Sequence, residues 1–221
     1  MSSSPAPTRR LLQAGVISGP LFIAAVLVQA VFRPGFDLRV HLISLLSLGE
    51  FGFVQITNFA VCGVLCLLLA VGMWRMLHPG PGGTFGPIFT ALHGALLIVV
   101  AFYVTDPVNG FPAGSVATTA PTPHGIVHAF GALWVFLTNA FALAALSRHF
   151  IEREHRREAA YCLAGVVALI VIFIGSFTST TNAAAFVDVA LVIGWMGLSV
   201  ISLELLGEMD HAHGHAVSTS P

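Results

Sequence analysis

Two histidines four residues apart, His124 and His128, are the side chains whose types and spacing best suit chemistry. Residues four apart lie on one face of a helix with their Cβ atoms about 6 Å apart, so both imidazoles can face one ion. They follow Pro123 at an expected helix start, where the helix dipole disfavours imidazolium and helps to keep both rings neutral. Neutral imidazole is a common metal ligand, so the pair indicates a metal site.

Other segments supply the remaining donors for such a site. Asp106 offers a carboxylate, and His41 or Asp188 offers a fourth donor. Histidines, a carboxylate and a bound water form the usual ligand set of catalytic zinc. Because zinc-bound water can attack an ester or an amide, the set predicts a zinc hydrolase that acts on a lipid-like substrate. The pair lacks the neighbouring glutamate of zinc proteases, so the pattern alone has low specificity.

A structural interpretation explains the same residues without a metal. Asp106 precedes a proline and would end its helix while pairing with Arg33 or Arg39. The two histidines would then donate hydrogen bonds to loop carbonyls. Asn58 and Asp188 would form hydrogen bonds between helices, as buried polar groups in membranes commonly do. In this reading the polar residues only hold the helices in position.

A third interpretation uses the charges of these groups. Histidine titrates near neutral pH, so Asp106, His124, His128 and Asp188 would exchange protons or bind a small polar ligand. The protein would then be a proton-coupled transporter or a sensor. The sequence leaves all three interpretations open, and it does not determine the oligomeric state.

The amino-acid composition indicates that these residues belong to a membrane protein. The chain is 56% hydrophobic and 9% charged, and it has no lysine. A soluble domain is about 25% charged, so lipid must be the solvent for most of this surface. Nucleic-acid binding needs a concentrated basic surface, which a net charge of −1 does not provide. We therefore predict a multi-pass protein of the cell membrane whose partner is the bilayer.

Six apolar segments are long enough to cross the hydrocarbon core, which takes about 20 helical residues. We predict an all-α bundle of six transmembrane helices in one domain over residues 11–207. A polar tail at 1–10 precedes it, and a flexible, histidine-rich tail at 208–221 follows it. The predicted helices are 11–32, 53–74, 85–104, 124–147, 159–178 and 186–207.

Arginine predicts the orientation, because cytoplasmic loops retain positive charge. Seven arginines lie on the side of the termini and two, Arg33 and Arg39, lie on the opposite side. Both termini are therefore expected in the cytoplasm, and the Asp and His residues are expected at the outer face. The first outer loop, 33–52, contains the apolar segment 40–48, which we expect to pack over the bundle as a cap.

Several short patterns along nearly the whole chain carry a family resemblance, and their residues are His41, Ser44, Ser47, Gly49, Asn58, Phe59, Gly63, Asp106, Pro107, Gly110, His124 and His128. Together they resemble a bacterial and archaeal integral membrane family called Domain of Unknown Function 998. The resemblance implies a six-helix architecture, but no activity.

A looser similarity is to the ceramidase and adiponectin-receptor-like membrane hydrolases, which combine Ser, Asp and three His around zinc. The residues that match in type are Ser44, Asp106, His41, His124 and His128. The similarity implies catalytic roles for Ser44 and Asp106. That superfamily has seven helices and places its histidine pair in the last one, whereas this pair opens the predicted fourth helix.

Overall fold

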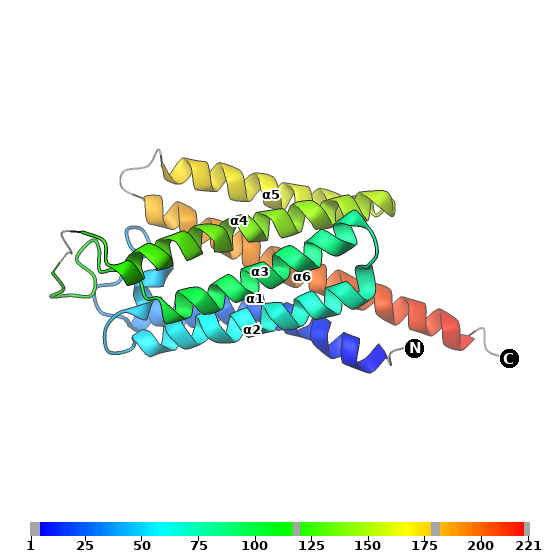
Figure 1. The fold of residues 1–221 in the computed structure, drawn as a ribbon, viewed down its shortest axis with the longest axis horizontal. Helices are drawn as coiled ribbons and strands as arrows, with labels where there is room; N and C mark the ends of the chain where they lie inside the picture. The colour runs from blue at the N-terminus through cyan, green and yellow to red at the C-terminus, as the bar shows by residue number, and fades with distance from the viewer. Residues whose placement is uncertain (1–4, 117–119, 178–181, 219–221) are drawn as a thin grey trace.

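The computed structural model describes residues 5–116, 120–177 and 182–218, which form six long helices and one short 3-10 helix (Figure 1). All six long helices are long and apolar enough to cross a membrane, as predicted. Their bounds are α1 Pro5–Phe32, α2 Gly52–Leu77, α3 Pro81–Phe102, α4 Pro123–Glu152, α5 Arg156–Ser176 and α6 Ala183–Ser218, and the 3-10 helix η1 is Ile43–Ser47.

The first and last helices of the chain, α1 and α6, are longer than the sequence predicts. Helix α1 includes residues 5–10 of the predicted N-terminal tail, and residues 1–4 lie outside the described part of the chain. Helix α6 continues through 208–218 of the predicted C-terminal tail, and 219–221 lie outside the described part. The change from apolar to polar residues marks where a membrane span ends, but backbone hydrogen bonding continues beyond it.

The start of α3 also differs from the prediction. Residues 78–83 have the composition of a turn, yet the helix begins within this segment at Pro81. Proline is favoured in the first turn of a helix because its missing N–H would have no partner there. The same rule holds for α4, where Pro123 is the first helical residue, at the helix start that the sequence predicts, and Thr122 is the N-cap.

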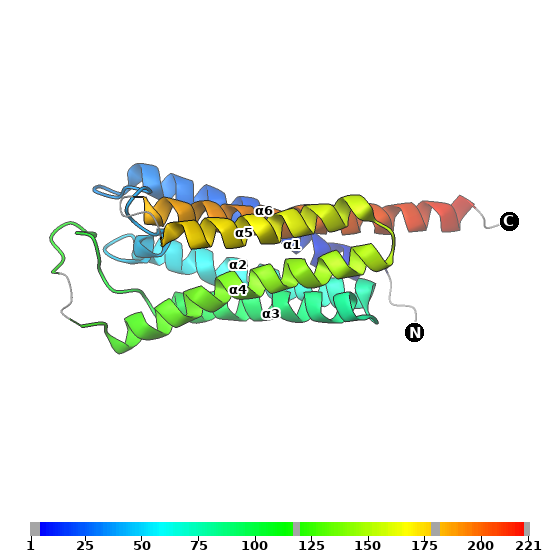
Figure 2. The same cartoon turned by 90° about the horizontal axis from the view of Figure 1, so that it is seen from above.

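The six helices form a closed ring in which each packs against the next and α6 returns to α1 (Figures 1 and 2). Both termini lie at one end, which we call the terminal end. At the other end, which we call the loop end, lie the α1–α2 connection, the described parts of the α3–α4 connection, the end of α5 and the start of α6. All predicted site residues of these connections therefore share one end of the bundle.

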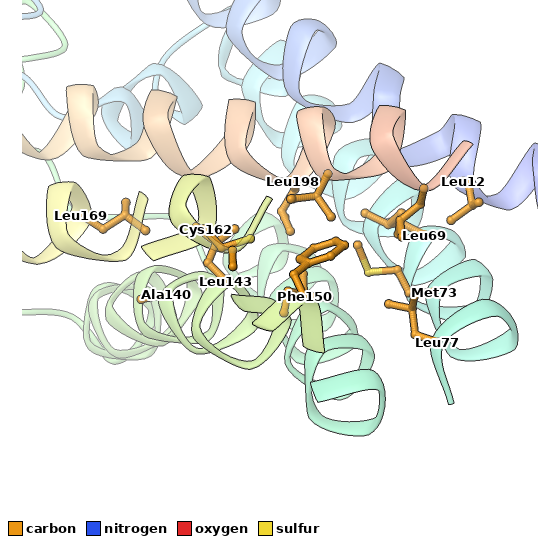
Figure 3. Close-up of a cluster of buried hydrophobic side chains, with 14 of the residues drawn as sticks. Leu12, Leu69, Met73, Leu77, Ala140, Leu143, Phe150, Cys162, Leu169 and Leu198 are labelled. Carbon is orange, nitrogen blue, oxygen red and sulfur yellow. The ribbon is translucent and has the colours of Figure 1, made fainter. Parts of the chain in front are cut away.

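Two apolar clusters fill the ring. The cluster nearer the terminal end joins five helices through side chains such as Leu12, Leu69, Phe150 and Leu198 (Figure 3). The cluster nearer the loop end contains Trp195, which stacks on Phe22 with ring centroids 4.5 Å apart. Burial of apolar surface is not the driving force inside a bilayer, so close packing of these side chains must hold the helices together.

The α1–α2 connection covers the loop end. Ile43 and Leu46 of η1 are buried in the loop-end cluster, which confirms the predicted packing of segment 40–48 over the bundle. Arg33 holds this connection in place, because its guanidinium donates hydrogen bonds to the carbonyl oxygens of Leu46 and Leu48. Burial lowers the pKa of Arg33.

Candidate functional site

A cavity of about 310 Å³ lies beneath η1 and is lined by residues from all six helices. We call it the central cavity. Its walls are mostly aliphatic and aromatic, and its polar side chains include Ser44, His128 and Asp188. Apolar walls with a few polar groups are typical of small-molecule sites. The wall residues include Phe22, Phe59, Leu97, Val135, Phe136, Phe173, Leu191 and Trp195.

His128 lines this cavity, and its two ring nitrogens differ in their hydrogen bonding. Its Nδ1 lies 2.7 Å from the carbonyl oxygen of Tyr103, which can only accept, so Nδ1 carries the proton. In the neutral ring Nε2 is then an acceptor. Nε2 is buried and has no hydrogen-bond partner among the described residues, and the residue is 3% exposed. Tyr103 therefore fixes His128 as a hydrogen-bond acceptor at the cavity wall.

Asp188 lies on α6, across the ring from His128 on α4. Its Oδ1 accepts a hydrogen bond from the backbone N–H of Ile43 at 3.3 Å, which links α6 to η1. Its Oδ2 is buried without a hydrogen-bond partner among the described residues, and the residue is 8% exposed. A buried polar atom without a partner is costly, so it needs an explanation.

Asp106 lies outside the central cavity and stabilises the start of α4. Its Oδ2 accepts from the backbone N–H of Thr122 at 2.8 Å, and its Oδ1 accepts from the Thr122 hydroxyl at 2.6 Å. The Thr122 hydroxyl accepts in turn from the N–H of Gly125. These bonds from Thr122 lower the pKa of Asp106, and the nearby His124 and His128 lower it further. Asp106 thus acts through the cap of α4 rather than by pairing with an arginine.

His41 has protein partners at both ring nitrogens. Its Nδ1 accepts from the backbone N–H of Asp37 at 2.9 Å, and its Nε2 donates to the carbonyl oxygen of Asn109 at 3.1 Å. The ring also packs against Phe36 and Phe111. His41 therefore ties the α1–α2 connection to the α3–α4 connection and has no lone pair free for a metal in this arrangement.

The predicted arginines and Asn58 have structural partners. Arg39 is exposed and pairs with Asp37 at 2.8 Å, and its hydrogen bonds lower the pKa of Asp37 to about 2. The predicted alternative in which Arg33 or Arg39 pairs with Asp106 is wrong, since Arg33 binds the carbonyls of the α1–α2 connection instead. Asn58 donates to the carbonyl oxygen of Phe22 at 3.2 Å and links α2 to α1.

The predicted metal ligands are only partly brought together. Asp106, His124 and His128 are near enough for their charges to interact, whereas His41 and Asp188 have different partners. Within the described ranges no group of three His, Cys, Asp or Glu side chains has the spacing of a metal site. The exposed His124 packs against the ring of Tyr103, with centroids 5.2 Å apart.

The sequence patterns grouped His128 and Asp188 with Asp106 and His124, whereas the structure places His128 and Asp188 on one cavity and Asp106 outside it. Two wall residues that the sequence patterns did not single out are Phe22 and Trp195, which come from different helices. Large aromatic residues are common along all membrane spans, so no local signal separates those facing a cavity from those facing lipid. The backbone carbonyl of Tyr103, which sets the His128 tautomer, has no sequence signal at all.

A family comparison agrees with this architecture. Residues 16–204 match the model of a family described as "Protein of unknown function (DUF998)". The chain belongs to this family. The DUF998 match includes residues of all six membrane helices and every residue that lines the central cavity, but it assigns no activity to them. No curated protein and no solved structure matches this DUF998 member.

Proposed function

We propose that this protein binds a lipid-like molecule in the central cavity, as a membrane sensor or carrier of that molecule. One observation carries the proposal: two buried polar atoms without partners among the described residues, His128 Nε2 and Asp188 Oδ2, belong to residues lining the same apolar cavity. A head group bound there would satisfy both atoms, and an apolar chain would contact the aromatic walls. The volume of about 310 Å³ is at the lower end of the range for small-molecule sites.

A lipid-facing groove supports access from the bilayer. This groove of about 200 Å³ lies between α1 and α6, and we call it the lateral groove. The exposed side chains of Leu27 and Val189 contribute to it. Phe22, Ile43 and Asp188 line both the lateral groove and the central cavity. A molecule in the bilayer would therefore reach Asp188 without first crossing water.

The proposal includes no hydrolytic step. Both oxygens of Asp106 and both ring nitrogens of His41 already bond to protein groups, so the predicted zinc hydrolase requires these residues to exchange their partners. Binding in the central cavity requires no such exchange, because His128 Nε2 and Asp188 Oδ2 have no hydrogen-bond partner in the described part of the chain.

The first prediction concerns occupancy of the cavity. The protein in lipid nanodiscs is mixed with four probes, each of which has a twelve-carbon chain that carries a photoreactive diazirine. The probes differ in their head group, which is an amine, an alcohol, a carboxylic acid or a trimethylammonium group. We expect at least one probe to cross-link to peptides containing cavity-wall residues. Leu191→Trp fills the cavity and should abolish this cross-link, since Leu191 lies in its wall.

Leu203→Trp is the matched control, because Leu203 is exposed on the same helix and should face lipid. We expect Leu203→Trp to cross-link like the wild-type protein. If each of the four probes cross-links as strongly to Leu191→Trp as to the wild-type protein, the proposed binding function is wrong.

A further inference from the structure

Among the residues that line the central cavity, the two buried polar atoms without a partner among the described residues are hydrogen-bond acceptors when His128 is neutral and Asp188 is ionised. The hydrogen bond to Tyr103 makes Nε2 of His128 an acceptor when the ring is neutral. The free atom of Asp188 is a carboxyl oxygen. Phosphate and carboxylate head groups need donors, usually arginine or backbone N–H groups. A negatively charged head group therefore does not suit this pair.

Asp188 also lacks a positively charged partner. The chain has no lysine, and no arginine or histidine forms an ion pair with Asp188 within the described ranges. Arg39 also lines the lateral groove, but its guanidinium is bound to Asp37. Burial of an unpaired carboxyl group favours its protonated form, so Asp188 is ionised in this cavity only when a cation lies beside it. A bound ligand can supply that cation.

Resting on the proposed function, we infer that the bound molecule is a long-chain primary amine in its ammonium form. The ammonium group supplies the positive charge next to Asp188 and donates to its free Oδ2. Its remaining N–H groups can donate to other acceptors of the wall, which include Nε2 of His128 and the hydroxyl of Ser44. The alkyl chain extends along the aromatic side chains, which contact it without hydrogen bonds.

The same four head groups test this inference on the unchanged protein. Unlabelled dodecylamine, dodecanol, dodecanoic acid and dodecyltrimethylammonium compete against the photoreactive amine probe. We expect the amine to compete at least about tenfold better than the alcohol, since one charge-assisted hydrogen bond in place of a neutral one suffices for this ratio. Dodecanoic acid should compete least. Dodecyltrimethylammonium has the charge without N–H donors and should fall between the amine and the acid.

Asp188→Asn separates charge from shape. It keeps the size of the side chain and removes its negative charge, so the apparent affinity for dodecylamine should fall about tenfold or more while that for dodecanol changes less than about threefold. Gel filtration and thermal unfolding of the variant check that it is folded. If the variant does not fold, the competition among the four head groups on wild-type protein still tests whether the ligand is an amine.

The outcomes distinguish this inference from the proposed function. If dodecanol or dodecanoic acid competes as well as dodecylamine, the amine inference is wrong while binding in the cavity stands. If dodecyltrimethylammonium equals dodecylamine, the donor requirement is wrong. If no probe cross-links specifically to the cavity wall, the proposed function itself fails.

Discussion

Asp106 and Asp188 are both aspartates near helix ends at the loop end, yet their surroundings differ. Asp106 accepts two hydrogen bonds from Thr122, so its carboxylate is stabilised by the protein itself. Asp188 lines an apolar cavity and accepts one hydrogen bond from Ile43, and its other oxygen has no hydrogen-bond partner among the described residues. A satisfied carboxylate stabilises the fold, whereas an unsatisfied one at a cavity wall suits a ligand.

At the residue scale we predict the effect of removing the cap of α4. Thr122→Ala removes the N-cap hydroxyl and should lower the free energy of unfolding by about 1 kcal/mol, whereas Thr122→Ser should restore it. Thermal unfolding in detergent measures both. A midpoint for Thr122→Ala equal to that of wild type at pH 7 would contradict the role of this hydrogen bond.

The same variant should alter the pH dependence of stability. Thr122 lowers the pKa of Asp106 in the folded protein, so the resulting stabilisation is present above the ordinary carboxyl pKa of about 3.9. It is lost as the pH falls through the lowered pKa of the folded state. The difference in midpoint between wild type and Thr122→Ala should therefore shrink at acidic pH, and a constant difference would count against this linkage.

At the scale of the helix, the α2–α3 contact depends on two glycines. A Cβ atom on Gly63 would lie 2.7 Å from the carbonyl oxygen of Gly94, and one on Gly94 would lie 2.6 Å from that of Gly63. The two backbones therefore approach more closely than alanine permits. Small residues at such positions let membrane helices gain packing contacts.

Gly63→Ala should push α2 and α3 apart and lower the free energy of unfolding by about 1–3 kcal/mol, as overpacking usually does. Gly207→Ala is the matched control on α6, where a Cβ atom would meet nothing within 4 Å. It should be neutral or slightly stabilising, because alanine favours helix more than glycine does. Equal unfolding midpoints for the two variants in detergent would refute the close contact.

At the scale of the whole molecule, the two termini lie at one end of the bundle (Figure 2). The central cavity lies toward the other end, beneath η1. Which end faces the cytoplasm follows from arginine. Seven of the nine arginines lie at the terminal end, so the positive-inside rule predicts that this end is cytoplasmic. The central cavity and the lateral groove would then lie in the outer half of the membrane.

Cysteine labelling in whole cells tests the orientation. Ser115→Cys lies in the α3–α4 connection and Glu154→Cys lies between α4 and α5. A membrane-impermeant maleimide should label Ser115→Cys in intact cells and Glu154→Cys only after lysis. The native Cys62, Cys66 and Cys162 are buried and should give little background. The reverse pattern would invert the topology.

The sequence alone determined the architecture. An apolar run of about 20 residues in lipid must satisfy its backbone hydrogen bonds internally, so helix is its only stable form. Helix number, the cap at 40–48 and the capping of α4 by Thr122 all follow from local patterns. The bounds of α1 and α6 did not follow, because helix formation continues into polar sequence beyond the membrane.

The tertiary structure alone decided which polar side chains share a site. The i, i+4 spacing of His124 and His128 constrains one helix, and it says nothing of what lies across the bundle. Packing turns His128 toward the cavity that Asp188 also lines, while His124 remains exposed. Which nitrogen of His128 is free depends on a carbonyl of Tyr103 that any residue would carry. The polar atoms that the central cavity offers to a ligand depend on contacts between helices, and no local sequence pattern predicts these contacts.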